Sequence, residues 1–252
     1  MLDMQPQLAR PNGQHPIPVR RRKHARPPAD RAPAMVGWLS SDAEEIERRR
    51  WRGRTEIGQI EPLERDLPYF GSFRVRSAGG SVYDVEIRSL DQPLNSCGCA
   101  DHRVNGLGTC KHVEGVLAKL RQRGVRAFKA AQRAGSPRVE LFLPRTGDPV
   151  PRLLWPADPA TVEAARAALA PFMAADGSLS DASPDRIDAL LHLVTDAGPL
   201  VQRQLRVSRH LEPWLADARR RAARIEARAL FEAEVEAGTQ TIDLLRHPLL
   251  PY

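Results

Sequence analysis

The alternation of apolar and polar residues predicts a β-hairpin in the first half of the chain. Phe73 and Val75 alternate with polar neighbours, and a second alternating run follows at residues 83–88. An Ala-Gly-Gly sequence at residues 78–80 separates the runs and favours a turn. The period of two predicts two antiparallel strands with one buried face. A third short strand is expected at residues 94–99.

A different periodicity on either side of the hairpin predicts helices. One apolar stripe repeats at spacings of three and four, which indicates a helix beginning near Cys110; its residues are Val113, Val116, Leu117 and Leu120. Before the hairpin, Ser41 and Glu44 form a capping box that predicts a charged helix ending at Gly53.

The second half of the chain reads as a hairpin followed by helices. Residues 139–143 and 150–155 are apolar runs joined by a turn sequence at 145–148. Helix starts are expected at Asp158-Pro159 and at Ser183-Pro184, where a capping residue precedes proline. In the helix that begins at Ser183-Pro184, the apolar stripe consists of Ile187, Leu190, Leu191 and Val194. A long arginine- and alanine-rich helix is expected from Ser208 to Gly238.

These patterns predict an α+β protein with four regions. Residues 1–36 contain seven prolines and few large apolar residues, so we expect a disordered basic arm. A charged helix is expected within 37–53, a lobe of hairpin plus helix within 54–134, and a hairpin plus mostly helical region within 135–252.

Charge and composition narrow the range of functions. The net charge is +7, but residues 1–36 carry +5 of it, so the high isoelectric point describes mainly the arm. A solvated arm is favoured over a nucleic-acid contact for its Arg20–Arg26 run. No apolar stretch suits a membrane span or a signal segment, which makes the cytoplasm the expected location.

All three cysteines lie in one short window, CGCADHRVNGLGTCKH, at residues 97–112. An odd number of cysteines in a cytosolic protein favours a metal site or a reactive thiol over disulfides. Cys97, Cys99, Cys110 and His112 form a set of four soft or borderline ligands, which is typical of structural Zn²⁺. Four protein ligands leave no open coordination position.

Two alternatives compete with this ligand set. His102 is a competing ligand, although the set is complete without it and a histidine in an exposed loop is common. The second alternative is a thiol catalyst formed by Cys110 and His112. A separation of two positions on one helical turn, however, is poor geometry for a nucleophile and its base.

The pattern Cys-x-Cys-x(n)-Cys-x-His, preceded by a hairpin and followed by an apolar helix, resembles the SWIM-type zinc finger. Residues 105–120, NGLGTCKHVEGVLAKL, are similar to the SWIM segment of bacterial Swi/Snf-type helicases. By this resemblance Cys97, Cys99, Cys110 and His112 are the zinc ligands. Ala100 departs from it, since many members have proline there.

The resemblance also implies a helicase, but this chain carries no helicase core. Residues 244–252, LLRHPLLPY, resemble the lead-in to that core, and no Gly-x4-Gly-Lys-Ser/Thr loop occurs in the sequence. We therefore expect a non-enzymatic accessory module, either a protein of its own or the front part of a split or truncated helicase.

The expected partners are nucleic acid, with DNA favoured, or a helicase or ATPase protein. The run 119–133 is basic without an acidic residue, and its residues Lys119, Arg123, Arg126 and Arg133 share one helical face if Gly124 does not break the helix. A solvated helix face, or a docking adaptor without nucleic-acid binding, is the alternative. The aromatic residues Tyr69, Phe70, Phe73 and Tyr83 are expected in the core and not as base-stacking residues.

Overall fold

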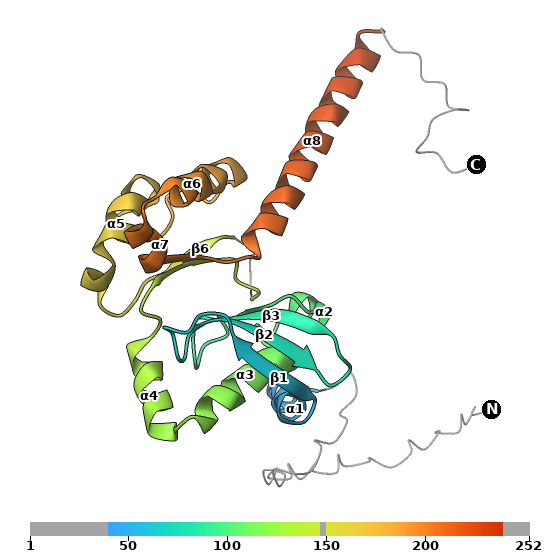
Figure 1. Cartoon of the computed structure of the whole chain (residues 1–252). Helices are drawn as coiled ribbons and strands as arrows, with labels where there is room; N and C mark the ends of the chain where they lie inside the picture. Colours follow the sequence, from blue (N-terminus) through green and yellow to red (C-terminus); the bar gives the residue numbers. More distant parts are fainter. Residues whose placement is uncertain (1–39, 147–149, 239–252) are drawn as a thin grey trace, which may run out of the picture. The chain divides into compact units, whose positions relative to one another are not determined.

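The computed structural model describes residues 40–146 and 150–238, and its chain trace is shown in Figure 1. The expected basic arm, the centre of the turn at 145–148 and the segment 244–252 lie outside these described residues. The helices, in chain order, are α1 (Asp42–Thr55), α2 (Ala100–Val104), α3 (Lys111–Gln122), α4 (Val125–Ala134), η1 (Pro159–Val162), α5 (Glu163–Leu169), η2 (Ala170–Phe172), α6 (Pro184–Asp196), α7 (Pro199–Gln204) and α8 (Leu211–Glu236).

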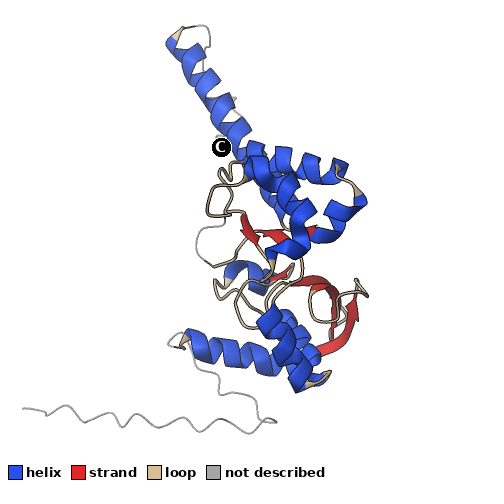
Figure 2. Cartoon of the chain, turned by 90° about the vertical axis from the view of Figure 1, so that its left-hand side faces the viewer, coloured by secondary structure: helices blue, strands red, loops and turns tan. Residues whose placement is uncertain are grey.

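The strands form two separate sheets. Sheet A has the order β1-β2-β3-β4 and sheet B the order β6-β5-β7. Their members are β1 (Ile57–Pro62), β2 (Gly71–Ser77), β3 (Val82–Ile87), β4 (Ser96–Cys97), β5 (Val139–Phe142), β6 (Arg152–Leu154) and β7 (Leu205–Val207). Antiparallel strands combined with helices confirm the α+β class, and Figure 2 shows how the strands and helices are distributed.

Sheet A contains the predicted hairpin. Strands β2 and β3 pair antiparallel, with Phe73 opposite Val85 and Val75 opposite Tyr83. The short strand β4 pairs with β3, which confirms the third strand. Strand β1 was not predicted. Its sequence IGQIEP contains glycine and proline, which disfavour a strand in isolation, and it forms on the β2 edge.

The core of this part lies between sheet A and α3. Val113, Val116 and Leu120 on α3 are at most 1% exposed and share one hydrophobic cluster with Phe73 and Val85. The predicted stripe of α3 is therefore the buried face of the helix. The aromatic residues of the hairpin also belong to this cluster: Phe70 and Phe73 are buried, and Tyr69 and Tyr83 pack against it while partly exposed.

Helix α1 crosses α3 at two glycines. A Cβ atom on Gly53 would lie 2.6 Å from the backbone nitrogen of Gly115, and one on Gly115 would lie 2.9 Å from the carbonyl oxygen of Gly53. Only the absence of side chains lets the two backbones approach this closely. Gly53 was predicted as the helix end, but α1 continues to Thr55 because this glycine serves helix packing.

Gly124 breaks the helix, so the condition for a shared face of the basic run is not met. Gly124 has φ 146°, a conformation that residues with a side chain rarely adopt, and it separates α3 from α4. Lys119 and Arg123 therefore belong to α3 and its C-terminal cap, whereas Arg126 and Arg133 belong to α4. The four residues do not share one helical face.

Sheet B and the helices that follow it form a second hydrophobic cluster. Strands β5 and β6 pair antiparallel, as predicted for residues 139–143 and 150–155, and β7 pairs parallel to β5. The chain between β5 and β7 supplies α5, α6 and α7. The predicted stripe of α6 packs inward through Ile187, Leu190 and Val194, with Leu191 partly buried. Helix α7 and strand β7 were not predicted.

Buried hydrogen bonds connect the two sheets. Glu86 on β3 accepts a hydrogen bond from the Ser208 hydroxyl at 2.6 Å. Arg206 on β7 donates to the Glu140 carboxylate at 2.6 Å and to the carbonyl oxygen of Ile87, in sheet A, at 3.3 Å. These side chains are at most 9% exposed.

Arg88 lies at the centre of this ionic cluster. Its side chain is fully buried, and its guanidinium forms an ion pair with Glu86 and lies 3.7 Å from Glu140. It also donates to the Ser96 hydroxyl at 2.7 Å and lies 5.0 Å from the ring centre of Phe142. The part of the second face of sheet A that carries Glu86 and Arg88 is therefore covered by a polar, paired contact with sheet B, whereas Arg74 and Arg76 on the same face are exposed.

Candidate metal centre

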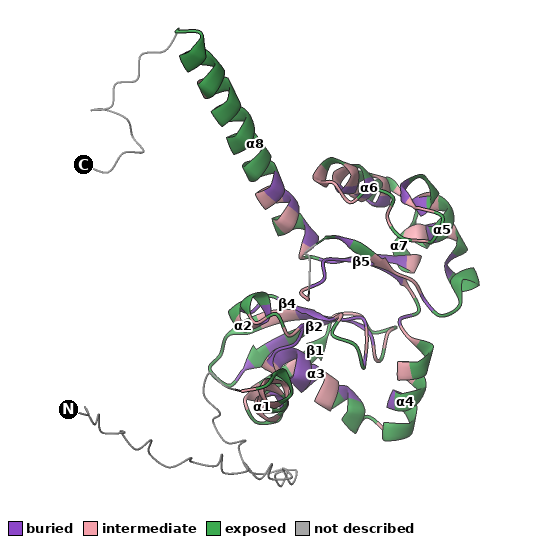
Figure 3. Ribbon diagram, turned by 180° about the vertical axis from the view of Figure 1, so that it is seen from behind, coloured by how far each residue is buried: buried purple, intermediate pink, exposed green. Residues whose placement is uncertain are grey.

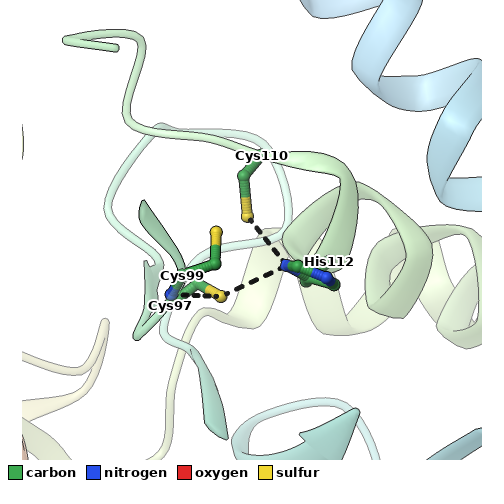
Figure 4. Close-up of side chains that lie close together, drawn as sticks. All are labelled: Cys97, Cys99, Cys110 and His112. Atoms are coloured by element: carbon green, nitrogen blue, oxygen red, sulfur yellow. Dashed lines mark hydrogen bonds between the residues drawn. The ribbon is translucent and has the colours of Figure 1, made fainter. Parts of the chain in front are cut away.

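Four side chains from three elements converge beside the end of sheet A. Cys97 ends β4, Cys99 is the N-cap of α2, Cys110 is the N-cap of α3, and His112 lies in the first turn of α3. Figure 4 shows the three sulfur atoms and the imidazole turned toward a common centre. All four residues are buried, and their ligand atoms lie within 4.8 Å of one another.

The distances suit one tetrahedral metal ion. Nδ1 of His112 lies 3.7 Å from Sγ of Cys97 and 4.0 Å from Sγ of Cys110. In a tetrahedron with metal–sulfur bonds of about 2.3 Å and a metal–nitrogen bond of about 2.0 Å, neighbouring ligand atoms are separated by roughly 3.5 to 3.8 Å. The cluster is therefore able to hold a metal ion once ligand atoms that lie within 4.8 Å of one another draw together to these separations.

Backbone N–H groups are directed at two of the sulfur atoms. The N–H of Cys99 lies 3.5 Å from the Cys97 sulfur, and the N–H of His102 donates to the Cys99 sulfur at 3.3 Å. Such hydrogen bonds stabilise a thiolate more than a neutral thiol. The second bond also caps α2, so the fold of this short helix and the placement of the sulfur atom depend on each other.

The three thiols also perturb one another. Hydrogen bonds from Cys110 and Cys97 lower the pKa of the Cys99 thiol, whereas burial raises the pKa of Cys110 well above its usual value. One thiolate therefore forms readily, and each further buried thiolate is opposed by burial and by its neighbours. A bound cation removes that opposition, which is the chemistry expected of a metal-binding cluster.

The loop between the two ligand pairs is fixed to α1. Arg49 donates two hydrogen bonds to the Asp101 carboxylate, at 2.7 and 3.1 Å, and the Asn105 amide donates to the carbonyl oxygen of Thr109 at 2.8 Å. The Thr109 hydroxyl in turn donates to Glu114 at 2.8 Å. These contacts hold both ends of the loop, so the ligand pairs are positioned by the fold.

The two histidines of the window have different environments. The His112 ring packs on Tyr83, with ring centres 4.2 Å apart, and its Nδ1 faces the thiols. His102 is not part of the cluster, but it is 1% exposed, so the expectation of an exposed loop histidine is wrong. Burial lowers the pKa of His102 to about 4, which keeps its imidazole neutral at pH 7.

Sequence reasoning missed the residues that support the ligands. Tyr83 was identified only as a core residue, although it packs on a ligand. The Arg49–Asp101 pair joins positions 52 residues apart, and neither residue has a local pattern that identifies the other. Such support is recognisable only after α1 is placed on the loop.

The basic residues of the predicted nucleic-acid surface are exposed but lie apart from the metal cluster. Lys119, Arg123, Arg126 and Arg133 are all exposed. On α4, Arg126, Lys129 and Arg133 follow at spacings of three and four, so that they share one face, while Phe128 is buried on another. The exposed basic face of this region therefore belongs to α4.

The helices of the described residues include none that is long and apolar enough to cross a membrane. No protein-family model, curated protein or solved structure matches the chain. What the fold and the cluster establish is a mixed α+β protein with a buried Cys3His group able to hold a metal ion.

Proposed function

We propose that this chain is a structural zinc module of the SWIM type that binds nucleic acid, with DNA the favoured ligand. The observation that carries the proposal is the convergence of four buried ligand atoms within 4.8 Å. Three thiols and one imidazole favour Zn²⁺ over Mg²⁺ or Ca²⁺, which prefer oxygen ligands. Four protein ligands also fit a structural ion better than a catalytic one.

The arrangement of the elements supports the SWIM resemblance. A hairpin and a short third strand carry the first ligand pair, and the start of an apolar helix carries the second. This is the order of elements that the resemblance implies. Association with a Swi/Snf-type helicase rests on that resemblance, and we propose it as the setting in which the module works.

The nucleic-acid surface that we propose is the exposed basic face of α4 together with the end of α3. Residues 119–133 include Lys119, Arg121, Arg123, Arg126, Lys129 and Arg133 and no acidic side chain. Arg121 lies over the ring of Phe128, 5.2 Å from its centre, which holds this side chain between the two helices. A surface of this kind binds phosphates without reading sequence, so its affinity falls as salt rises.

One experiment on the purified chain tests both parts of the proposal. We expect one zinc per chain, and binding to duplex DNA whose affinity falls steeply with salt. The triple variant Arg126→Glu, Lys129→Glu, Arg133→Glu should lose most of this binding and keep its zinc, because these side chains lie outside the core. Its salt dependence should also be shallower, because fewer phosphates are neutralised by the protein.

The matched control changes three exposed arginines elsewhere, on β6, α5 and α7: Arg152→Glu, Arg166→Glu, Arg203→Glu. It alters the net charge equally and should bind DNA more strongly than the α4 variant. Equal loss in both variants would show a general charge effect and not a surface on α4. Zinc without any DNA binding would favour the docking adaptor, and a chain without zinc would remove the basis of the proposal.

A further inference from the structure

The long helix α8 leaves most of its length uncovered. Only its first two turns are buried, through Leu211, Leu215 and Ala218. From Arg219 to Glu236 every residue is exposed except Phe231, which is partly exposed, and Figure 3 shows this stretch in green. These 18 residues extend about 27 Å. Most of the stability of helices in proteins comes from packing of one face, so a partner that covered this stretch would stabilise it.

The buried stripe of α8 continues into the exposed part. Leu211, Leu215 and Ala218 are followed at spacings of four, three and four by Ala222, Ile225 and Ala229. Ile225 is 71% exposed. The spacing is that of the contact face in a two-helix coiled coil, and alanines on both sides of Ile225 let a second helix approach closely.

The charges of the exposed part are divided between its two ends. Residues 219–228 contain five arginines and one glutamate, whereas residues 229–236 contain three glutamates and no basic residue. Glu234 and Glu236 in the last turn oppose the helix dipole, which favours basic residues near the end of a helix. Within the chain Arg219 pairs with Asp188, Arg220 and Arg221 pair with Asp217, and Arg228 pairs with Glu232. Largely exposed ion pairs of this kind contribute little to stability, so they do not by themselves account for the division of charge between the two ends.

We propose that α8 pairs antiparallel with α8 of a second copy of this chain. A twofold axis near Ala227 places Ile225 of each copy against Ala229 of the other. The arginines at 219–221 of one helix then lie beside the glutamates at 232–236 of the other. The two helix dipoles point in opposite directions, which is the favourable arrangement. A parallel pair would bring arginines against arginines, and a nucleic acid along the helix would meet the three glutamates.

The proposed dimer is salt-sensitive and of moderate affinity. One helix pair of about 27 Å buries less surface than a standard stable interface. We therefore expect a monomer–dimer equilibrium that shifts toward the monomer when the protein is diluted or the salt is raised. Sedimentation velocity of the full chain, over a concentration series at low and high salt, measures this shift.

Charge-swap variants identify the helix and its direction. One variant replaces Arg219, Arg220 and Arg221 by Glu, and a second replaces Glu232, Glu234 and Glu236 by Arg. Each alone should be monomeric, because like charges then meet at both ends, and an equimolar mixture of the two should form dimers. The chain carrying all six changes should dimerise as the unaltered chain does, and it is the matched control because it has the same net charge.

Circular dichroism and metal content should be unchanged in all variants, since the altered side chains are exposed. The proposal is overturned if the unaltered chain stays monomeric at the highest concentration reached, or if either triple variant dimerises as well as the unaltered chain. It is also overturned if the six-change chain is monomeric. None of these results bears on zinc or DNA binding by the other part of the chain.

Discussion

At the scale of single residues, the fold buries charged side chains at positions that the sequence pattern predicts to be exposed to solvent. Glu86 and Arg88 occupy the polar positions of an alternating strand, yet both are at most 2% exposed because sheet B covers that face. Burial alone would raise the pKa of Glu86, but Arg88, Ser208 and Arg206 outweigh it and hold the pKa at about 2. The Arg88 guanidinium stays charged beside it.

This pKa gives Glu86 a measurable effect on stability. A carboxylate whose pKa falls from 4.5 to about 2 on folding stabilises the protein above pH 4.5, and this contribution is lost as the pH falls toward 2. The free energy of unfolding of the Glu86→Gln variant should be lower by about 3 to 5 kcal/mol at pH 7, because Arg88 then loses its nearest charged partner. Its free energy of unfolding should also depend less on pH between 4.5 and 2.

Urea unfolding over that pH range measures both effects. Glu61→Gln, on the exposed edge strand β1, is the matched control and should cost less than about 0.5 kcal/mol at pH 7. Metal content is measured at each pH, since acid also releases metal from thiolates. Equal pH dependence in the Glu86→Gln variant and the unaltered chain would contradict the assigned pKa.

At the scale of elements, the contact between α1 and α3 depends on the glycine pair. Gly53→Ala gains helix propensity, worth about 1 kcal/mol, but its Cβ would lie 2.6 Å from the Gly115 nitrogen and 2.8 Å from the Lys111 carbonyl oxygen. Backbone atoms cannot move aside as a flexible side chain can. Because of this strain, we expect the free energy of unfolding of Gly53→Ala to be lower by about 1 to 3 kcal/mol.

Thermal and urea unfolding test this loss. Gly79→Ala is the control, since a Cβ at Gly79 meets no atom within 4 Å. It should leave the free energy of unfolding nearly unchanged. A Gly53→Ala variant as stable as the unaltered chain would show that α1 can shift on α3, and the close crossing would then not be required by the fold.

The elements also show which features a sequence can predict. The hairpin, α3 and the four-residue Cys/His set follow from local periodicity and spacing, and the structure contains each of them. Strand β1 exists because β2 provides an edge, and β7 because β5 does, so neither has a strong local pattern. Gly124 was recognised as a potential helix stop, and only its backbone conformation shows that it separates two helices.

At the scale of the whole molecule, the metal cluster and the ionic cluster meet on β4, where Cys97 belongs to the first and the preceding Ser96 contacts the second. Val85 pairs with Cys97, and the adjacent Glu86 pairs with Ser96, to whose hydroxyl Arg88 donates. Loss of the metal would loosen β4. Arg88, which donates to Ser96 on β4 and lies 3.7 Å from Glu140 of sheet B, would then be held less firmly. Arg206 and Glu140 would then be less well paired in a buried site, which is costly.

The stability of sheet B should therefore depend on a metal that sheet B does not contact. The variant His112→Gln removes one ligand, whereas His192→Gln changes a histidine on α6 whose side chain is 77% exposed, and it serves as the control. Hydrogen exchange of the metal-loaded chains should show lost protection in β3, β4 and α3 of the first variant, and also in β5 and β7. If β5 and β7 instead stay as protected as in the control, with loss only around the cluster, the two sheets fold independently. Loss in both sheets would mean that the buried ion pairs transmit metal binding across the fold, so that the surface of the second half is fully formed only when the metal is bound.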